Sequence, residues 1–233
     1  MSKPRFAWSY SAVSAFNTCP RKFYNERVLK RYPFVSTAAA EYGKRLHGAI
    51  ELYGRDATPL PQEFQFTKPI VDIVRDCVRG EKFWERKVAF KEDFTECTYF
   101  DKETWLRAQL DFLSVDMDSG VARVIDWKSG GSKYADTTQL ELMALVTFKL
   151  YPQIEQVKAG LSFVVEGRFV PATYYAQKQE AYWMRWNEDL ERMDAAYVSG
   201  VWNPKPNGLC RKHCPVTDCE FNGGYTGAIQ KQG

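Results

Sequence analysis

The sequence has no uninterrupted apolar run near the roughly 20 residues that a membrane-spanning helix requires. It also lacks an internal repeat, a low-complexity tract and a linker rich in glycine, serine or proline. With 32 basic and 29 acidic residues, the net charge of +3 is too small to argue for a polyanionic partner. Residues 1–8 carry basic side chains without a following apolar stretch. We therefore expect a soluble, cytoplasmic protein without a membrane partner, forming a single domain over residues 1–233.

Hydrophobic periodicity divides the chain into helical and extended segments. Patterns typical of helices predict them at 9–16, 20–28, 37–53, 69–83, 135–150 and 177–198. Alternation of aromatic or β-branched residues with polar ones predicts strands at 88–100, 104–117, 121–127, 156–165 and 168–174. Together these elements predict an α/β domain with a central mixed β-sheet flanked by helices, its core spanning about residues 37–200.

Acidic residues interrupt two of the apolar predicted strands. Asp111 lies in one, and the triplet Asp126-Trp127-Lys128 ends the next. In a strand, Asp126 and Lys128 project from the same face, and strand pairing would bring Asp111 close to them. Two carboxylates suit Mg²⁺ or Mn²⁺, and the lysine could orient an attacking water or stabilise transition-state charge. The alternative is an Asp–Lys ion pair on a solvated face.

The predicted helix at 37–53 adds polar residues on one face. His47 and Glu51 are four residues apart, and Gly43 lies one turn earlier, where a close approach to another segment is possible. His47 is one of two histidines in the chain, and it is a candidate metal ligand. The alternative is a histidine that is hydrogen-bonded at a helix surface.

These residues occur in an order that resembles a known enzyme family. The pattern is Gly43-x3-His47-x3-Glu51, then Asp111, then Asp126-Trp127-Lys128, then Gln139. It is similar to the PD-(D/E)XK nuclease superfamily, and more narrowly to its RecB-like branch, over roughly residues 9–219. One departure is Met143, which stands where the family's Q-x-x-x-Y motif has tyrosine. It affects a supporting contact to substrate and alters no metal ligand.

The resemblance implies a role for each matching residue. The implied ligands of Mg²⁺ or Mn²⁺ are His47, Asp111, Asp126 and the main-chain carbonyl of Trp127. Lys128 would assist the attacking water, and Gln139 would help to place the phosphate or the lysine. Glu51 is a weaker candidate, which would lie behind the direct ligands.

The six cysteines are expected to be reduced in an intracellular protein. Cys77 and Cys97 are isolated, which predicts small buried hydrophobic residues. The other four are predicted to ligate a metal centre if the fold brings the chain ends together: Cys19, Cys210, Cys214 and Cys219. Four thiolates suit zinc or an iron-sulfur cluster, and His213 is a possible substitute ligand for zinc.

The arrangement of these cysteines resembles the iron-sulfur nucleases of the AddAB type and the CRISPR-associated RecB-like exonucleases. That resemblance implies a [4Fe-4S] cluster, with Zn²⁺ as the alternative. The cluster would form a module from about residues 9–31 and 203–222 that joins the N- and C-termini.

Basic and aromatic residues alternate at 21–32, a composition that suits a single nucleic-acid strand. The candidate DNA-binding residues are Arg21, Lys22, Tyr24 and Arg27. The alternative is a solvated helix face whose aromatic side chains point into the core.

Taken together, the residues and the resemblance predict a metal-dependent deoxyribonuclease. We expect an exonuclease that acts on DNA ends or single strands in recombination, repair or replication and leaves 5′-phosphates. A Walker-type G-x4-G-K-[ST] motif is absent, so unwinding would need a helicase or recombination partner. The alternatives are an endonuclease of the same fold and a non-catalytic DNA-binding module.

Overall fold

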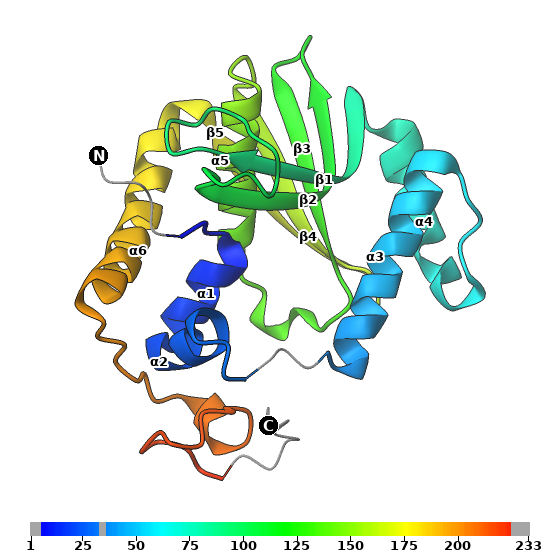
Figure 1. Ribbon diagram of the computed structural model, residues 1–233. Helices are drawn as coiled ribbons and strands as arrows, with labels where there is room; N and C mark the ends of the chain where they lie inside the picture. The colour runs from blue at the N-terminus through cyan, green and yellow to red at the C-terminus, as the bar shows by residue number, and fades with distance from the viewer. Residues whose placement is uncertain (1–5, 33–35, 225–233) are drawn as a thin grey trace. The chain divides into compact units, whose positions relative to one another are not determined.

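A computed structural model describes residues 6–32 and 36–224 of the chain (Figure 1). The chain divides into two compact units. One comprises residues 37–184, and the other comprises residues 1–36 together with 185–233. The expectation of a single domain stays a prediction.

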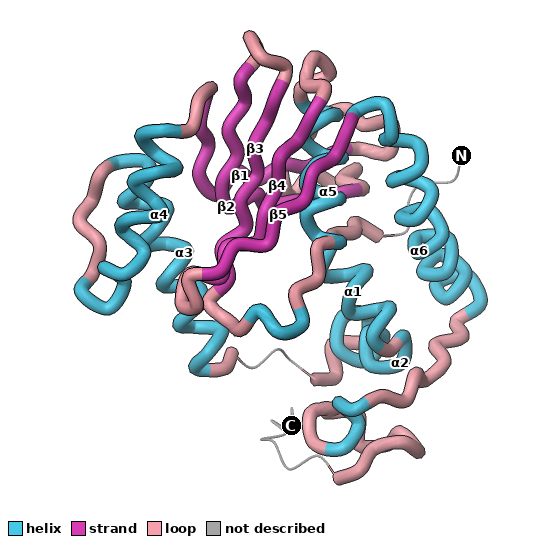
Figure 2. The backbone as a smooth tube through the Cα atoms, turned by 180° about the vertical axis from the view of Figure 1, so that it is seen from behind, coloured by secondary structure: helices cyan, strands magenta, loops and turns pink. Residues whose placement is uncertain are grey.

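The unit formed by residues 37–184 is built on one five-stranded mixed sheet. Its strands are β1 (Glu81–Phe90), β2 (Leu106–Asp116), β3 (Val121–Lys128), β4 (Gln156–Phe163) and β5 (Arg168–Tyr175), and they pair in chain order. β3 and β4 are parallel, and the other neighbours are antiparallel. The parallel pair is joined by α5 (Thr138–Leu150), since parallel strands require a crossover. The predicted mixed sheet with flanking helices is confirmed (Figure 2).

One side of the sheet is covered by α3 (Ala38–Asp56). Thr37 caps this helix by accepting the Ala40 N–H at 3.2 Å. Its apolar stripe, which includes Leu46 and Ile50, packs in one cluster with strand residues such as Trp127. In contrast, α5 is buried along nearly its whole length from residue 140 to 148. A helix that is apolar on most sides belongs inside the protein, where α5 contacts β2, β3, β4 and β5.

The first strand starts earlier than predicted. The predicted helix at 69–83 is replaced by α4 (Lys68–Asp72) and a π-helical turn (Ile73–Cys77). Gly80, with φ +92°, then turns the chain into β1. The predicted strand at 88–100 is correct only up to Phe90, where β1 ends. Beyond it, the side chains of Asp93 and Asp101 each accept the backbone N–H of the residue two positions ahead, and these bonds fold residues 91–105 into turns.

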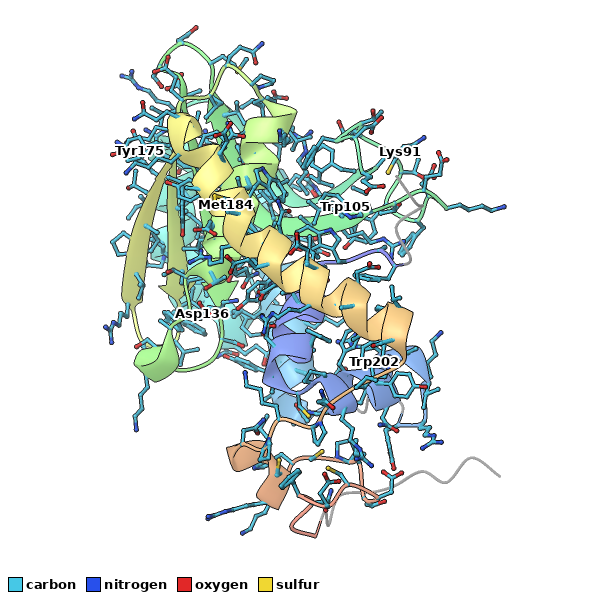
Figure 3. The ribbon with its side chains drawn as sticks, turned by 90° about the vertical axis from the view of Figure 1, so that its left-hand side faces the viewer. Lys91, Trp105, Asp136, Tyr175, Met184 and Trp202 are labelled. Carbon is cyan, nitrogen blue, oxygen red and sulfur yellow. The ribbon has the colours of Figure 1, made fainter. Side chains whose placement is uncertain are left out.

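The other unit contains α1 (Tyr10–Thr18), α2 (Pro20–Phe23), a π-helical turn (Tyr24–Val28) and the tail with its 3₁₀ turn (Gly208–Arg211). It also contains the part of α6 (Gln179–Ser199) from residue 185 onward. Trp202, labelled in Figure 3, stacks on Tyr24 with ring centroids 4.9 Å apart and on Phe23 at 6.0 Å. These rings fix the start of the tail against the first helices of the chain. Among the described residues, no helix is long and apolar enough to cross a membrane.

Candidate metal centre and cysteine cluster

The candidate metal centre lies where β2 and β3 stop pairing. Their last ladder pair at this end is Phe112 with Ile125. One residue further, the Asp111 carboxylate replaces the ladder, because its Oδ2 accepts the Trp127 N–H at 2.8 Å. The side chain is buried and fixed by main chain, so it is pre-positioned at this edge of the sheet.

A glutamate that the sequence analysis missed faces Asp111 from β1. Glu85 lies between the pairs Trp84–Phe112 and Arg86–Leu110, and so directly opposite Asp111. Its φ of +49° is in the left-handed region, which is costly for a residue with a side chain. A strand assigned from residue 81 would have revealed this position, but the helical pattern at 69–83 concealed it.

His47 of α3 connects the two carboxylates. Its Nδ1 lies 3.3 Å from Glu85 Oε1 and 3.3 Å from Asp111 Oδ2. Each of the three residues offers one ligand atom, and these atoms lie within 4.8 Å of one another. Within the described part of the chain, this is the one group of three histidine, cysteine or acidic residues with that property.

The electrostatics of this group suit a cation. Burial alone would lower the pKa of His47, but hydrogen bonds to Asp111 and Glu85, together with their charges, raise it to about 10. The two carboxylates therefore stabilise the protonated, positively charged form of His47. One imidazole nitrogen with carboxylate oxygens is a donor set that fits Mg²⁺ or Mn²⁺, so the residues present fit the expected metal.

Beside this group, Asp126, Lys128 and Gln139 form a closed triangle. Lys128 Nζ lies 2.6 Å from Asp126 Oδ2 and donates to Gln139 Oε1 at 2.8 Å. The Gln139 amide in turn donates to Asp126 Oδ1 at 2.7 Å. Burial and the charge of Asp111 raise the pKa of Asp126 to about 7, against the opposing effect of Lys128. The lysine is thus held in place by two partners.

Other predicted residues near the centre have distinct surroundings. The metal-ligand roles of Asp126 and of the Trp127 carbonyl stay predictions, since Asp126 is outside the group of three. Glu51 forms an ion pair with Arg55 on its own helix. The close approach expected at Gly43 is present, because a Cβ there would lie 3.1 Å from Ser129 Oγ. Glycine at this position lets α3 pack against the segment that follows β3.

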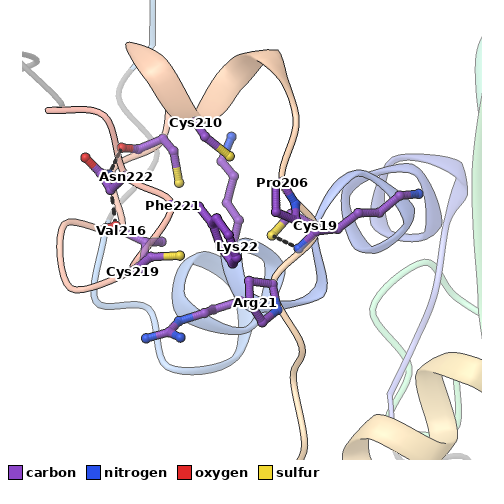
Figure 4. A pocket seen from close by; sticks show the side chains of 12 residues that line it. Cys19, Arg21, Lys22, Pro206, Cys210, Val216, Cys219, Phe221 and Asn222 are labelled. Carbon is purple, nitrogen blue, oxygen red and sulfur yellow. Dashed lines mark hydrogen bonds between the residues drawn. The ribbon is translucent and has the colours of Figure 1, made fainter.

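The four predicted cysteines line one pocket in the other unit (Figure 4): Cys19, Cys210, Cys214 and Cys219. Main-chain N–H groups of the tail already donate to two of the sulfurs. Lys205 N–H donates to Cys19 Sγ at 3.4 Å, and Asn207 N–H donates to Cys210 Sγ at 3.4 Å. Burial is the main cause that raises the pKa of the Cys214 thiol. The structure thus brings the four thiols from both ends of the chain to one place.

The tail is tied to the first helices by polar contacts as well. The Asn207 amide donates to Thr18 O at 3.0 Å, and Lys205 Nζ donates to Asn17 O at 2.9 Å. His213, the possible substitute ligand, is exposed and is not among the residues that line the pocket.

The prediction for the two remaining cysteines is wrong in part. Cys77 is exposed, and Cys97 is partly buried, with its sulfur 3.6 Å from Thr104 Oγ1. On the π-helical turn that occupies part of the predicted helix, Val74 is buried, whereas Asp76 and Cys77 lie on the exposed side.

Most of the predicted DNA-binding residues have partners in their own unit. Arg21 Nη1 pairs with Glu220 Oε2 at 3.1 Å, and Lys22 Nζ lies 3.7 Å from Glu26 Oε1. Tyr24 stacks on Trp202, as described above, and Arg27 is exposed. The DNA-binding role of these four residues stays a prediction.

Comparisons with known proteins place this geometry in a family. The family model "PD-(D/E)XK nuclease superfamily" matches residues 7–219. A crystal structure from Eubacterium rectale, of a protein provisionally named an exonuclease, is 13% identical with a TM-score of 0.50, covering 88% of this chain and 85% of that one. The crystal structure of SSO0001 is 11% identical with a TM-score of 0.42, covering 95% and 90%. No curated protein matches the sequence. Since the family model spans most of its length, the chain belongs to the PD-(D/E)XK nuclease superfamily.

Proposed function

We propose that this nuclease is a metal-dependent DNA exonuclease that hydrolyses phosphodiester bonds at DNA ends or in single strands. The observation that carries the proposal is the convergence of His47, Glu85 and Asp111 beside the fixed Lys128. A non-catalytic DNA-binding module would need neither the triangle around the lysine nor a donor set that fits a divalent cation. The name of the Eubacterium rectale protein supports the choice of exonuclease over endonuclease.

The chain's own residues divide the work of hydrolysis. His47, Glu85 and Asp111 would hold Mg²⁺ or Mn²⁺, joined by Asp126 and the Trp127 carbonyl. When bound, the ion acidifies water and screens the negative charge of the phosphate. Lys128 is directed by Asp126 and Gln139, so its ammonium orients the attacking water and opposes the charge that develops on the phosphate. His47 must be deprotonated to bind the ion, so the metal competes with a proton.

The test is degradation of four DNA substrates: linear molecules labelled at an end and circular molecules labelled internally, each single- and double-stranded. We expect Mg²⁺- or Mn²⁺-dependent loss of linear DNA, with circular molecules left intact. Asp126→Ala and Lys128→Ala should abolish the activity, whereas Asp116→Ala, an acidic residue of β2 outside the centre, should retain it. Cutting of circular single strands would favour an endonuclease. Activity that survives Lys128→Ala or a chelator would contradict the proposal.

We further propose that the four cysteines bind a [4Fe-4S] cluster. No three of these described cysteines have sulfur atoms that all lie within 4.8 Å of one another. The sulfurs are therefore more widely spaced than the ligand atoms of the metal centre. A single tetrahedral zinc ion with bonds of about 2.3 Å would draw its sulfurs closer together than that. Anaerobically purified protein should be brown with broad visible absorption. A colourless protein with stoichiometric zinc would favour Zn²⁺.

A partner with helicase activity would supply single strands, in line with a role in recombination or repair. This part of the proposal rests on the family resemblance and on the missing Walker motif. Co-purification of an ATP-dependent helicase with the tagged chain from its own cell would test it.

A further inference from the structure

A row of basic and polar side chains leads away from the candidate metal centre along β1 and β2. The pair Glu85–Asp111 is followed in register by Lys87–Gln109 and then by Ala89–Arg107. Residues two apart in a strand point to the same face, so Lys87, Gln109 and Arg107 share the face of the metal centre. Gln109 joins the row to the centre, since its amide donates to Glu85 Oε2. From Asp111 to Arg107 the row spans about 13 Å, at about 3.3 Å per residue.

The row ends at two aromatic rings in the loop that joins the strands. Arg107 Nε donates to Tyr99 O at 2.7 Å, and its Cζ lies 5.8 Å from the Tyr99 ring and 5.4 Å from the Phe100 ring. Lys87 Nζ lies 5.8 Å from the Tyr99 ring. Both cations therefore converge on one tyrosine, which confirms that they occupy the same face.

Phe100 is the most exposed large hydrophobic side chain in the described part of the chain, at 80%. Its ring is held edge-on to Tyr99, with centroids 5.2 Å apart. A phenylalanine that is almost fully in water contributes little to folding, but an immobilised open ring is a platform on which a base stacks. Stacking needs an unpaired base, so this ring fits a single strand and not a duplex.

The charges in and beside this loop also favour a single nucleic-acid strand as the ligand. The acidic residues nearest the strands have local partners, since Glu103 pairs with Lys91 at 2.6 Å and Asp101 accepts the Glu103 N–H. Lys91 and Trp105, labelled in Figure 3, mark the two ends of this loop. Among the described residues, Lys87 and Arg107 have aromatic partners and no ion-pair partner. Their charges are available to phosphates.

We propose that this row, Lys87, Arg107 and Phe100, binds single-stranded DNA a few nucleotides from the bond to be cleaved. Lys87 and Arg107 contact successive phosphates, and Phe100 stacks on a base. The proposal rests on the proposed nuclease function, and it assigns the substrate path to β1 and β2. This is a different surface from the basic segment at 21–32 that the sequence indicated.

The test measures binding without cleavage. A fluorescent 12-nucleotide oligo(dT) is titrated with the full chain in chelator, and anisotropy gives the dissociation constant at several salt concentrations. We expect Phe100→Ala to weaken binding about tenfold, the effect of one lost stacking contact. Lys87→Ala should weaken it severalfold and reduce the slope of log K against log salt by about 1, as for one lost phosphate contact.

Matched controls are Phe169→Ala and Lys158→Ala, which remove an exposed ring and an exposed amine elsewhere on the same sheet. They should bind within twofold of the parent. Parental affinity of both Phe100→Ala and Lys87→Ala would overturn the proposal, as would equal losses in the controls.

A parallel assay of DNA degradation separates this proposal from the proposed function. If the parent chain degrades DNA but the two variants bind normally, the path is wrong and the nuclease stands. If the variants lose binding but the parent degrades no DNA with any divalent metal, the path stands and the proposed function fails.

Discussion

Replacing Asp126 by asparagine should make the metal-free protein more stable above neutral pH, although it removes a proposed catalytic group. Burial and the charge of Asp111 raise the pKa of this carboxyl from 3.8 to about 7. Between pH 3.8 and about 7 the folded chain keeps this proton, whereas the unfolded chain releases it. The free energy of unfolding therefore falls as pH rises through that window. At about 1.4 kcal/mol per pKa unit, the ionised carboxylate costs up to about 4 kcal/mol at pH 8. Asparagine carries no charge and avoids this cost.

Thermal and urea unfolding in chelator at pH 4.5, 6 and 8 would measure the effect. The advantage of Asp126→Asn over the parent should be small at pH 4.5 and grow to as much as about 4 kcal/mol at pH 8, roughly 10 °C in melting temperature. His47 also makes stability fall with pH, because its pKa is raised from 6.5 to about 10, but it is present in both proteins and largely cancels.

The matched control is Asp116→Asn, at an exposed carboxyl whose pKa is lowered, first by a hydrogen bond from Ser119. Its contribution to stability is present above the ordinary pKa and lost in acid, so this variant should gain nothing at pH 8. A parallel loss of stability by Asp126→Asn and the parent from pH 4.5 to 8 would show that ionisation of this carboxyl does not destabilise the fold.

Three further changes test other parts of the molecule. Gly54→Ala should destabilise the protein by about 1–3 kcal/mol, because a Cβ there would lie 2.4 Å from a tryptophan ring. Gly48→Ala has open space and should stabilise α3 by up to about 1 kcal/mol in the same urea titration. If the proposed cluster is bound, Cys19→Ser should lose its visible absorption, whereas the exposed Cys77→Ser should keep it with unchanged iron content. Glu85→Gln should weaken Mn²⁺ binding by about tenfold or more in isothermal titration, because it removes one ligand charge; unchanged affinity would exclude Glu85 as a ligand.

The fold could be predicted where one physical signal dominated. The apolar stripe of α3 was sufficient, because helix period and burial agree over residues 37–53. The loop at 91–105 was missed, since its aromatic residues alternate as in a strand while Asp93 and Asp101 form turns. An alternating pattern shows which side chains are apolar. It does not show where an aspartate side chain binds a backbone N–H group and so competes with strand pairing.

The candidate site was predictable where its residues form short motifs. Asp126 and Lys128 are two apart in one strand, and that spacing alone puts them together. Glu85 has no such neighbour, and its place opposite Asp111 depends on the register of β1 with β2. The cysteines were grouped by their type and by their arrangement along the chain. The hydrogen bonds that fix the tail beside Cys19 come instead from residues without any sequence signature, such as Asn207.

The contact at Gly43 limits how the centre can change. Because a single added methyl group would lie 3.1 Å from Ser129 Oγ, there is little room between α3 and the segment after β3. His47 lies on α3 and Lys128 is the last residue of β3, next to Ser129, so the same contact influences how far the imidazole lies from the ammonium. A bulkier residue at this one position would act as a spacer, moving the His47 imidazole away from the amine without altering any of the proposed catalytic groups.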